Sequence, residues 1–224
     1  MLRECSLEDI SDGRLYTEND LVRTDTGECV GCKQSCCQNM GNTIVLDPFD
    51  IYSLTTHLGK SFNELVGENI ELNVVDGVIL PNLKMSDLFN KCSFLDENER
   101  CSIHDIRPGI CRLFPLGRYW EDDEHFKYIL QKGQCHKDNL TKIKVKKWLG
   151  ITGISEYNVF VVKWHKFLKQ IQRSMTGLND EQVRILNMFI LKTFYQAPYS
   201  KSISFANQFD DRLMMVKDRL GLEE

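Results

Sequence analysis

Cysteine is the residue type whose number and spacing point most directly to chemistry in this sequence. Eight of the nine cysteines fall into two groups along the chain, namely Cys29, Cys32, Cys36 and Cys37, and then Cys92, Cys101, Cys111 and Cys135. Thiolates are the ligands of structural zinc and of iron–sulfur clusters, which take about four cysteines each. The eight side chains therefore predict a metal site that is assembled from distant parts of the chain, with Cys5 left outside it.

The spacing within the first group suggests how its sulfurs would be used. Cys29 and Cys32 are separated by two residues, and one tight turn containing Gly31 brings such a pair to the same ion. Cys36 and Cys37 are adjacent, and neighbouring side chains of extended backbone point to opposite faces. We therefore expect this adjacent pair to serve two metals, or two edges of one cluster.

Several arrangements of eight thiolates satisfy this pattern. They include two four-cysteine zinc sites, two iron–sulfur clusters, one of each, or one larger polynuclear site, and the spacing does not choose among them. The alternative without a metal is a set of small buried hydrophobic residues or disulfides. That alternative suits Cys5 better than the other eight cysteines.

Charged residues beside the cysteines are candidates for tuning the site. A metal–thiolate centre is anionic overall, so Lys33, Arg107 and Arg112 could stabilise it, although each could equally be a solvated surface charge. His104 follows Cys101 by three residues and could bind the metal or donate a hydrogen bond from outside its ligand set.

Charge and hydropathy narrow the protein class. The formal net charge of -4 argues against a nucleic-acid partner, apart from the locally basic stretch 142–147. The acidic N-terminus lacks the apolar run of a signal peptide, and no window reaches the ~20 apolar residues that span a bilayer. We therefore expect a soluble, cytoplasmic protein without a membrane partner, in a reducing compartment where dense cysteines indicate metal or catalysis.

The local patterns predict hairpins up to about residue 140. Asp76-Gly77 between two β-rich runs is a strong hairpin signal, with Pro81 ending the second strand. A second hairpin is expected from Cys92 to Ile103, which would bring Cys92 and Cys101 together across the ladder. A third is expected between 118–120 and 126–130.

Helical patterns surround and follow these hairpins. Asp47 and Pro48 predict a helix start, and three longer helices are expected to begin near Ser155, near Asp180 and around Phe205. The fold class is therefore α+β: an irregular, hairpin-rich cysteine-cluster part packed against a small helical part. We assign residues 1–140 to a metal-binding domain and 141–224 to a helical C-terminal extension.

The complete motif resembles a known family. It reads Cys29-x2-Cys32-x3-Cys36-Cys37, then Cys92, then Cys101-x2-His104-x2-Arg107-Pro108-x2-Cys111-Arg112-x-Phe114-Pro115, then Cys135. This pattern, over roughly residues 25–140, resembles YkgJ-type cysteine-cluster proteins, which carry a zinc- or iron-chelating CxxCxxxCC domain. The resemblance implies a metal-binding role, often labelled as iron–sulfur.

A related pattern occurs in flagellin lysine N-methylases of the FliB type, which are larger. This chain has a short C-terminal part, and its sequence shows no glycine-rich loop after a strand that would suggest an S-adenosylmethionine pocket. Three functions follow as hypotheses: a redox protein with an iron–sulfur or other polynuclear iron centre, a structural zinc protein that presents a surface to a protein partner, and a metal-dependent lysine-modifying enzyme. The sequence leaves open whether the chain is an enzyme.

Overall fold

The computed structural model describes residues 6–24, 37–86, 88, 90–134 and 140–222. Its helices are α1 (Leu7–Ile10), α2 (Pro48–Leu58), α3 (Phe62–Leu65), η1 (His104–Ile106), α4 (Gly109–Leu113), α5 (Val145–Leu149), α6 (Ile154–Ser174), α7 (Asp180–Leu191), η2 (Lys192–Gln196) and α8 (Phe205–Leu220). Its strands are β1 (Leu21–Thr24), β2 (Ile70–Val75), β3 (Val78–Leu83), β4 (Leu116–Trp120), β5 (Phe126–Leu130) and β6 (Thr141–Lys144). The predicted α+β class is confirmed.

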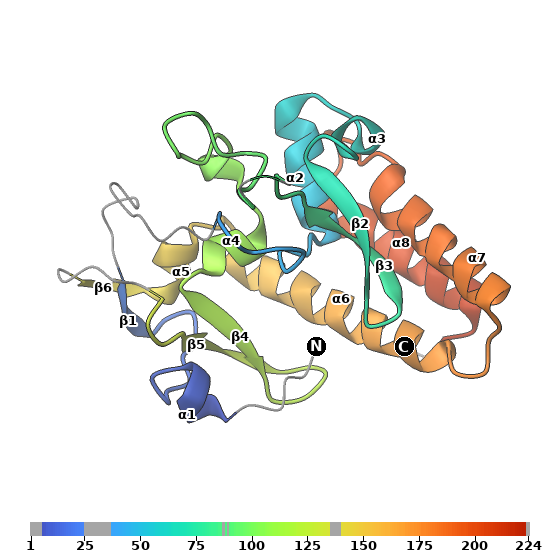
Figure 1. Ribbon diagram of the computed structural model, residues 1–224. Helices are drawn as coiled ribbons and strands as arrows, with labels where there is room; N and C mark the ends of the chain where they lie inside the picture. The colour runs from blue at the N-terminus through green and yellow to red at the C-terminus, as the bar shows by residue number, and fades with distance from the viewer. Residues whose placement is uncertain (1–5, 25–36, 87, 89, 135–139, 223–224) are drawn as a thin grey trace.

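Helix α6 is the longest element and runs across the molecule (Figure 1). Helices α2, α3, α7 and α8 lie on one side of it together with the β2–β3 hairpin. The β4–β5 hairpin and α5 lie nearer its N-terminal half, beside α4. The helix that carries Cys111 therefore lies close to the start of α6.

The start of α2 follows from its local sequence, as predicted. The Asp47 side chain accepts a hydrogen bond from the Asp50 N–H at 2.8 Å, and the Asp50 side chain accepts one from the Asp47 N–H at 3.0 Å. This reciprocal capping box satisfies amide groups that the first helical turn leaves without partners. Gly59 ends the helix in the left-handed conformation with φ 66°.

Two of the three predicted hairpins are confirmed. Strands β2 and β3 pair around Asp76 and Gly77, whose positive φ angles of 50° and 87° suit a tight hairpin turn. Pro81 does not end the second strand, because β3 continues to Leu83 and the Pro81 carbonyl accepts a hydrogen bond from the Leu46 N–H at 2.8 Å. Strands β4 and β5 form the predicted third hairpin.

The second hairpin is shorter than predicted, and its cysteines do not face each other. Cys101 lies opposite Leu95, whereas Cys92 pairs with Met85. The turn closes early because the Asp96 side chain accepts hydrogen bonds from two N–H groups of its own loop, including that of Arg100 at 2.8 Å. The Phe94 carbonyl still accepts the Ser102 N–H at 2.9 Å, and the chain before Phe94 then leaves the ladder for other partners.

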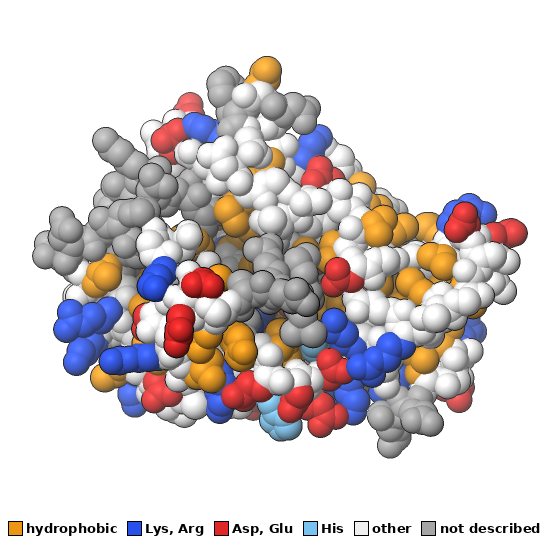
Figure 2. Space-filling view, turned by 60° about the horizontal axis from the view of Figure 1, so that its bottom comes forward, with side chains coloured by type: hydrophobic (Ala, Val, Ile, Leu, Met, Phe, Trp, Pro, Cys, Tyr) orange, Lys and Arg blue, Asp and Glu red, His pale blue; other side chains and the backbone are white. Residues whose placement is uncertain are grey.

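The basic stretch after residue 140 becomes a strand and then a helix. Strand β6 pairs antiparallel with β1, and α5 follows without a break. In Figure 2, Lys and Arg side chains gather at the left edge, whereas along the lower edge they alternate with Asp and Glu. No helix among the described residues combines the length and apolar character that crossing a bilayer requires.

The main hydrophobic core joins the two halves of the chain. It contains buried residues from Ile44 to Ile103 and from Tyr157 to Val216. Aromatic rings form much of its helical side, and Phe167, Phe194 and Phe209 are at most 1% exposed. The division into domains at residue 140 stays a prediction, and the two proposed parts share this core.

Candidate metal centre

Two predicted ligands from distant segments meet through their sulfurs, and a third lies beside them through its backbone. The Cys92 N–H donates a hydrogen bond to the Cys37 carbonyl at 2.8 Å, which fixes these two residues side by side. The Cys37 side chain is in turn hydrogen-bonded to the Cys101 sulfur. Cys92 is 6% exposed, and Cys37 and Cys101 pack against the same core. The fold thus brings Cys37 and Cys101 into contact although they lie 64 positions apart in the sequence.

The surroundings of Cys101 favour its thiolate form. The hydrogen bond from Cys37 lowers the pKa of the Cys101 thiol to about 7, aided by the Ile103 N–H and the positive charge of Arg107. Burial and the Asp96 carboxylate act in the opposite direction. Since the thiolate is the form that binds metal, this pair of sulfurs fits a zinc or iron centre.

Cys111 lies on α4 and packs against the same core as the other three described cysteines. The other four predicted ligands lie outside the described residues, namely Cys29, Cys32, Cys36 and Cys135. Cys5, which is not a predicted ligand, lies outside them as well. Among the described residues, no group of three or more His, Cys, Asp or Glu side chains is arranged to hold a metal ion. The eight-cysteine ligand set therefore stays a prediction.

His104 contacts Arg107 through its ring. The Arg107 Nη1 lies 2.9 Å from the His104 Nε2, and since a guanidinium can only donate, the Nε2 accepts this hydrogen bond. The His104 Nδ1 lies 3.9 Å from the Asp105 carboxylate. In this arrangement the histidine contacts an arginine close to Cys101, and its role at the metal, as a ligand or as a hydrogen-bonding neighbour, stays a prediction.

Arg112 is not a solvated surface charge, because its guanidinium binds three backbone carbonyls on two segments. Its Nε donates to the Arg107 carbonyl at 2.9 Å, another nitrogen donates to the Asp105 carbonyl, and Nη1 lies 3.4 Å from the Leu149 carbonyl. Burial lowers the pKa of this arginine, and Arg107 lowers it further. Arg112 therefore joins the Cys101–Cys111 segment to α5.

Two carboxyl groups at the start of α2, the half-buried Asp47 and the buried Asp50, lie near α4, and the sequence predicts only that Asp47 starts a helix. Asp50 is 5% exposed and its Oδ1 accepts a hydrogen bond from the Gly109 N–H at 2.8 Å. Burial raises the pKa of Asp47 to about 6, opposed by the Asp50 N–H and by Arg118. Burial and the neighbouring Asp47 carboxylate raise the pKa of Asp50 well above its ordinary value. The sequence could have drawn attention to this pair only through two acids in one helix start, and nothing in the sequence indicates how deeply they are buried.

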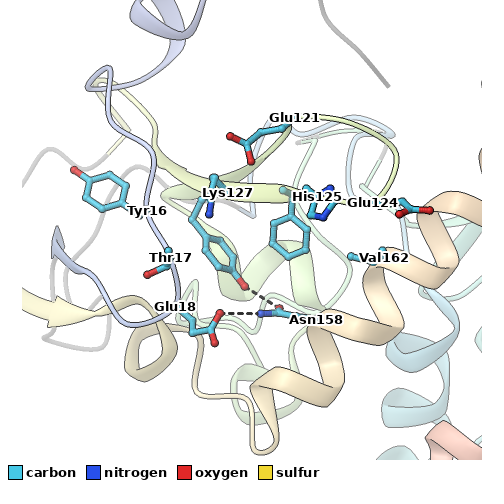
Figure 3. A pocket seen from close by; sticks show the side chains of 11 residues that line it. Tyr16, Thr17, Glu18, Glu121, Glu124, His125, Lys127, Asn158 and Val162 are labelled. Carbon is cyan, nitrogen blue, oxygen red and sulfur yellow. Dashed lines mark hydrogen bonds between the residues drawn. The ribbon is translucent and has the colours of Figure 1, made fainter.

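A pocket of about 230 Å³ lies on another part of the surface (Figure 3). It is bounded by the segment before β1, by β5 with the turn preceding it, and by α6, and none of its lining residues is a cysteine. The Tyr128 hydroxyl donates to the Asn158 side chain at 2.9 Å, and that amide lies 3.4 Å from the Glu18 carboxylate. These bonds join the segment before β1, strand β5 and helix α6 at the wall of the pocket. Tyr128 is therefore a buried tyrosine that is bonded to α6 away from the cysteines.

Comparison with known proteins agrees with the cysteine pattern. No curated protein and no solved structure matches this chain. A family model described as "CxxCxxCC: Putative zinc- or iron-chelating domain" matches residues 28–136, which include all eight predicted cysteine ligands. This description supports metal binding by cysteines. Residues 28–136 therefore match the model of a zinc- or iron-chelating CxxCxxCC domain, in agreement with the family resemblance that the cysteine spacing predicts.

Proposed function

We propose that this chain holds an iron–sulfur or other polynuclear iron centre and uses it for electron transfer. The proposed ligands are the sulfurs of Cys29, Cys32, Cys36, Cys37, Cys92, Cys101, Cys111 and Cys135. The observation that carries the proposal is the contact between the Cys37 and Cys101 sulfurs, with the backbone of Cys92 bonded beside them, in a stretch that matches a zinc- or iron-chelating domain. Cysteines that only filled a core would need neither this convergence nor an acidified thiol.

The number of ligands and the adjacent pair favour a centre with more than one metal. One tetrahedral ion is saturated by about four thiolates, so eight cysteines exceed the needs of a mononuclear site. Cys36 and Cys37 would point to opposite faces if the backbone there is extended, which suits two metals or two edges of a cluster.

The size of the hydrophobic core favours a redox role over a purely structural one. Small domains use a structural metal when they cannot bury enough apolar surface. Here Phe167, Phe194 and Phe209 are almost fully buried in a core that spans the chain. A metal centre in such a protein is available for chemistry, because the fold has another source of stability.

A structural zinc protein is the second candidate, and one observation favours it. Around Cys92 and Cys101 the described chain forms only isolated bridges and the short η1 helix. Irregular segments of this kind are typical of closed zinc sites, in which the free energy of metal binding is free energy of folding.

Metal analysis of protein purified without oxygen separates the two candidates. The redox proposal expects iron with acid-labile sulfide and a broad visible absorption that bleaches on reduction. Zinc without sulfide, in a colourless protein, would reject the iron centre and leave the structural candidate.

Substitution of single cysteines connects the metal to the site. Cys101→Ser and Cys37→Ser should each lower the metal content and weaken or remove the visible absorption. Cys5→Ser is the matched control, and it should retain the metal content of the unmodified chain. Equal metal content in all three variants would contradict the proposed ligand set.

A further inference from the structure

The helix that carries Cys111 is capped by a side chain from a distant helix. α4 starts at Gly109, and its N-cap residue is Pro108, whose ring offers no hydrogen-bond acceptor to the first amides. The Asp50 carboxylate of α2 takes that role, accepting the Gly109 N–H at 2.8 Å across 59 residues of sequence. A buried carboxylate at a helix N-terminus also stabilises the positive end of the helix dipole.

Gly109 is in close contact with α6. A Cβ atom on Gly109 would lie 2.0 Å from the Tyr157 hydroxyl oxygen, so a side chain cannot be accommodated while that hydroxyl keeps its place. Tyr157 is 5% exposed. The first turn of α4 is thus bounded by Asp50 and Tyr157, and its backbone has little freedom to shift toward them.

Tyr157 is itself positioned by charged groups. Its hydroxyl lies 3.5 Å from the Asp47 carboxylate and 3.4 Å from the Arg118 Nη2. The Arg118 guanidinium also lies over the Tyr157 ring, 5.7 Å from its centroid. The hydroxyl that limits Gly109 therefore has neighbours on the capping box of α2 and on β4.

We propose that Asp50 and Tyr157 are positioning residues for the metal centre, which they serve by fixing the helix that presents Cys111. Cys111 follows Gly109 by two residues within the five-residue α4, so the placement of Gly109 determines where the Cys111 sulfur lies. This inference rests on the proposed metal binding by the cysteines.

The inference extends the metal site beyond the family domain. The matched domain ends at residue 136, whereas Tyr157 belongs to α6. The helical part of this chain would then contribute to the geometry of the metal site, and a fragment restricted to the matched domain would lack this contact.

Cobalt(II) titration of the full-length protein, prepared without metal under reducing conditions, tests the proposal. Cobalt bound to thiolates gives charge-transfer and ligand-field bands, so the titration reports both affinity and geometry. Asp50→Asn should weaken cobalt binding about 10-fold, the lower end of what partners outside the ligand set contribute, and should shift these bands. Asp50→Ala, which loses both hydrogen bonds of the carboxylate, should have a larger effect.

Tyr157→Phe and Tyr128→Phe form the matched pair. Each variant removes one hydroxyl from a tyrosine that is at most 5% exposed. Tyr157 lies on α6 and Tyr128 is bonded to Asn158 of α6, but only Tyr157 contacts Gly109. Tyr157→Phe should weaken cobalt binding several-fold and shift the bands, whereas Tyr128→Phe should bind like the unmodified chain. A general loss of stability would lower the cobalt affinity of both variants by similar factors, and it would leave the absorption bands of bound cobalt unchanged.

The outcomes separate this inference from the proposed function. If the unmodified chain takes up no cobalt, the proposed function fails and this inference fails with it. If the unmodified chain binds cobalt and Asp50→Asn and Tyr157→Phe match it in affinity and spectrum, only the inference is overturned. Should Asp50→Ala not fold, Asp50→Asn still decides the question, because its amide keeps the shape of the side chain but has one acceptor oxygen for the two N–H groups that the carboxylate accepts, so one of the two hydrogen bonds is lost.

Discussion

The helical side of the core and the cysteine region are held together by different forces. Trp164, Phe194 and Phe209 pack with ring centroids 5.1 to 6.1 Å apart and are at most 7% exposed. Such a cluster is stabilised by the removal of large apolar surfaces from water. The positions of these side chains depend on how well their volumes fill the core, and each ring is held by several neighbours.

The cysteine region also packs against this core, but its separate segments are joined to one another by individual polar contacts. Cys37 and Cys92 are joined by one backbone hydrogen bond, and α4 is held by Asp50 and by the carbonyl contacts of Arg112. Each net hydrogen bond contributes only about 1 kcal/mol. The comparison teaches that the first region should be stable without metal, whereas the second needs a metal to gain comparable rigidity.

The largest expected effect is on the helical side. Phe194→Ala removes a fully buried ring that contacts Trp164 and Phe209, and it should lower the free energy of unfolding by about 3–5 kcal/mol in urea titrations. Val159→Ala, at a position 54% exposed on α6, is the control and should stay within about 0.5 kcal/mol. Similar losses for both variants would contradict a core organised around these rings.

Metal removal should affect the two regions unequally. A metal at a free concentration of about 100 times its Kd stabilises the folded state by about 2.7 kcal/mol, and this stabilisation is lost when a chelator removes the metal. Hydrogen exchange measured by mass spectrometry should accelerate between residues 84 and 113, while α6 and α8 keep their protection. Equal acceleration in both regions would show that the helical part depends on the metal as well.

Gly109→Ala tests the contact between the two regions. The added methyl group overlaps the Tyr157 hydroxyl, and overpacking of this kind costs about 1–3 kcal/mol, measured by urea unfolding. Tyr157→Phe in the same chain should restore part of the loss, because the next nearest atom is the ring carbon at 3.2 Å. Additive losses in the double variant would argue against a direct contact.

The smallest effect concerns pH. Because the pKa of Asp47 is raised from 3.8 to about 6, the folded state holds a proton that the unfolded state releases between those values. Stability contributed by this group is therefore present at low pH and decreases as the pH rises through that window. Asp47→Asn keeps a good N-cap and should make this decrease smaller in unfolding curves than it is in the unmodified chain, while Asp50, whose pKa is also raised, keeps the remaining pH dependence. An identical pH dependence in both proteins would contradict the raised pKa of Asp47.

Features set by neighbouring residues were predictable from the sequence. The capping box at Asp47 and Asp50 depends on residues three positions apart, and the β2–β3 hairpin depends on Asp76-Gly77. The family resemblance was likewise contained in cysteine spacing, and the family match confirms it.

Features set by tertiary packing were not predictable in the same way. Cys92 pairs with Met85 and not with Cys101, because the Asp96 turn closes early and the chain finds partners elsewhere. The contact of Asp50 with Gly109 joins groups 59 residues apart, and no periodicity or propensity records it. The π-helical turn η2 after α7 also went unpredicted, since the sequence pattern there reads as one continuous helix.

Cysteine alkylation read out residue by residue tests the central claim most directly. The intact protein and the chelator-treated protein are each treated with an alkylating reagent and analysed by mass spectrometry of their peptides. We expect all eight proposed ligands, including Cys37 and Cys101, to be protected in the intact protein and to react after chelation, whereas chelation should not change the reactivity of Cys5. Equal reactivity of the eight cysteines before and after chelation would contradict a cysteine-bound metal centre.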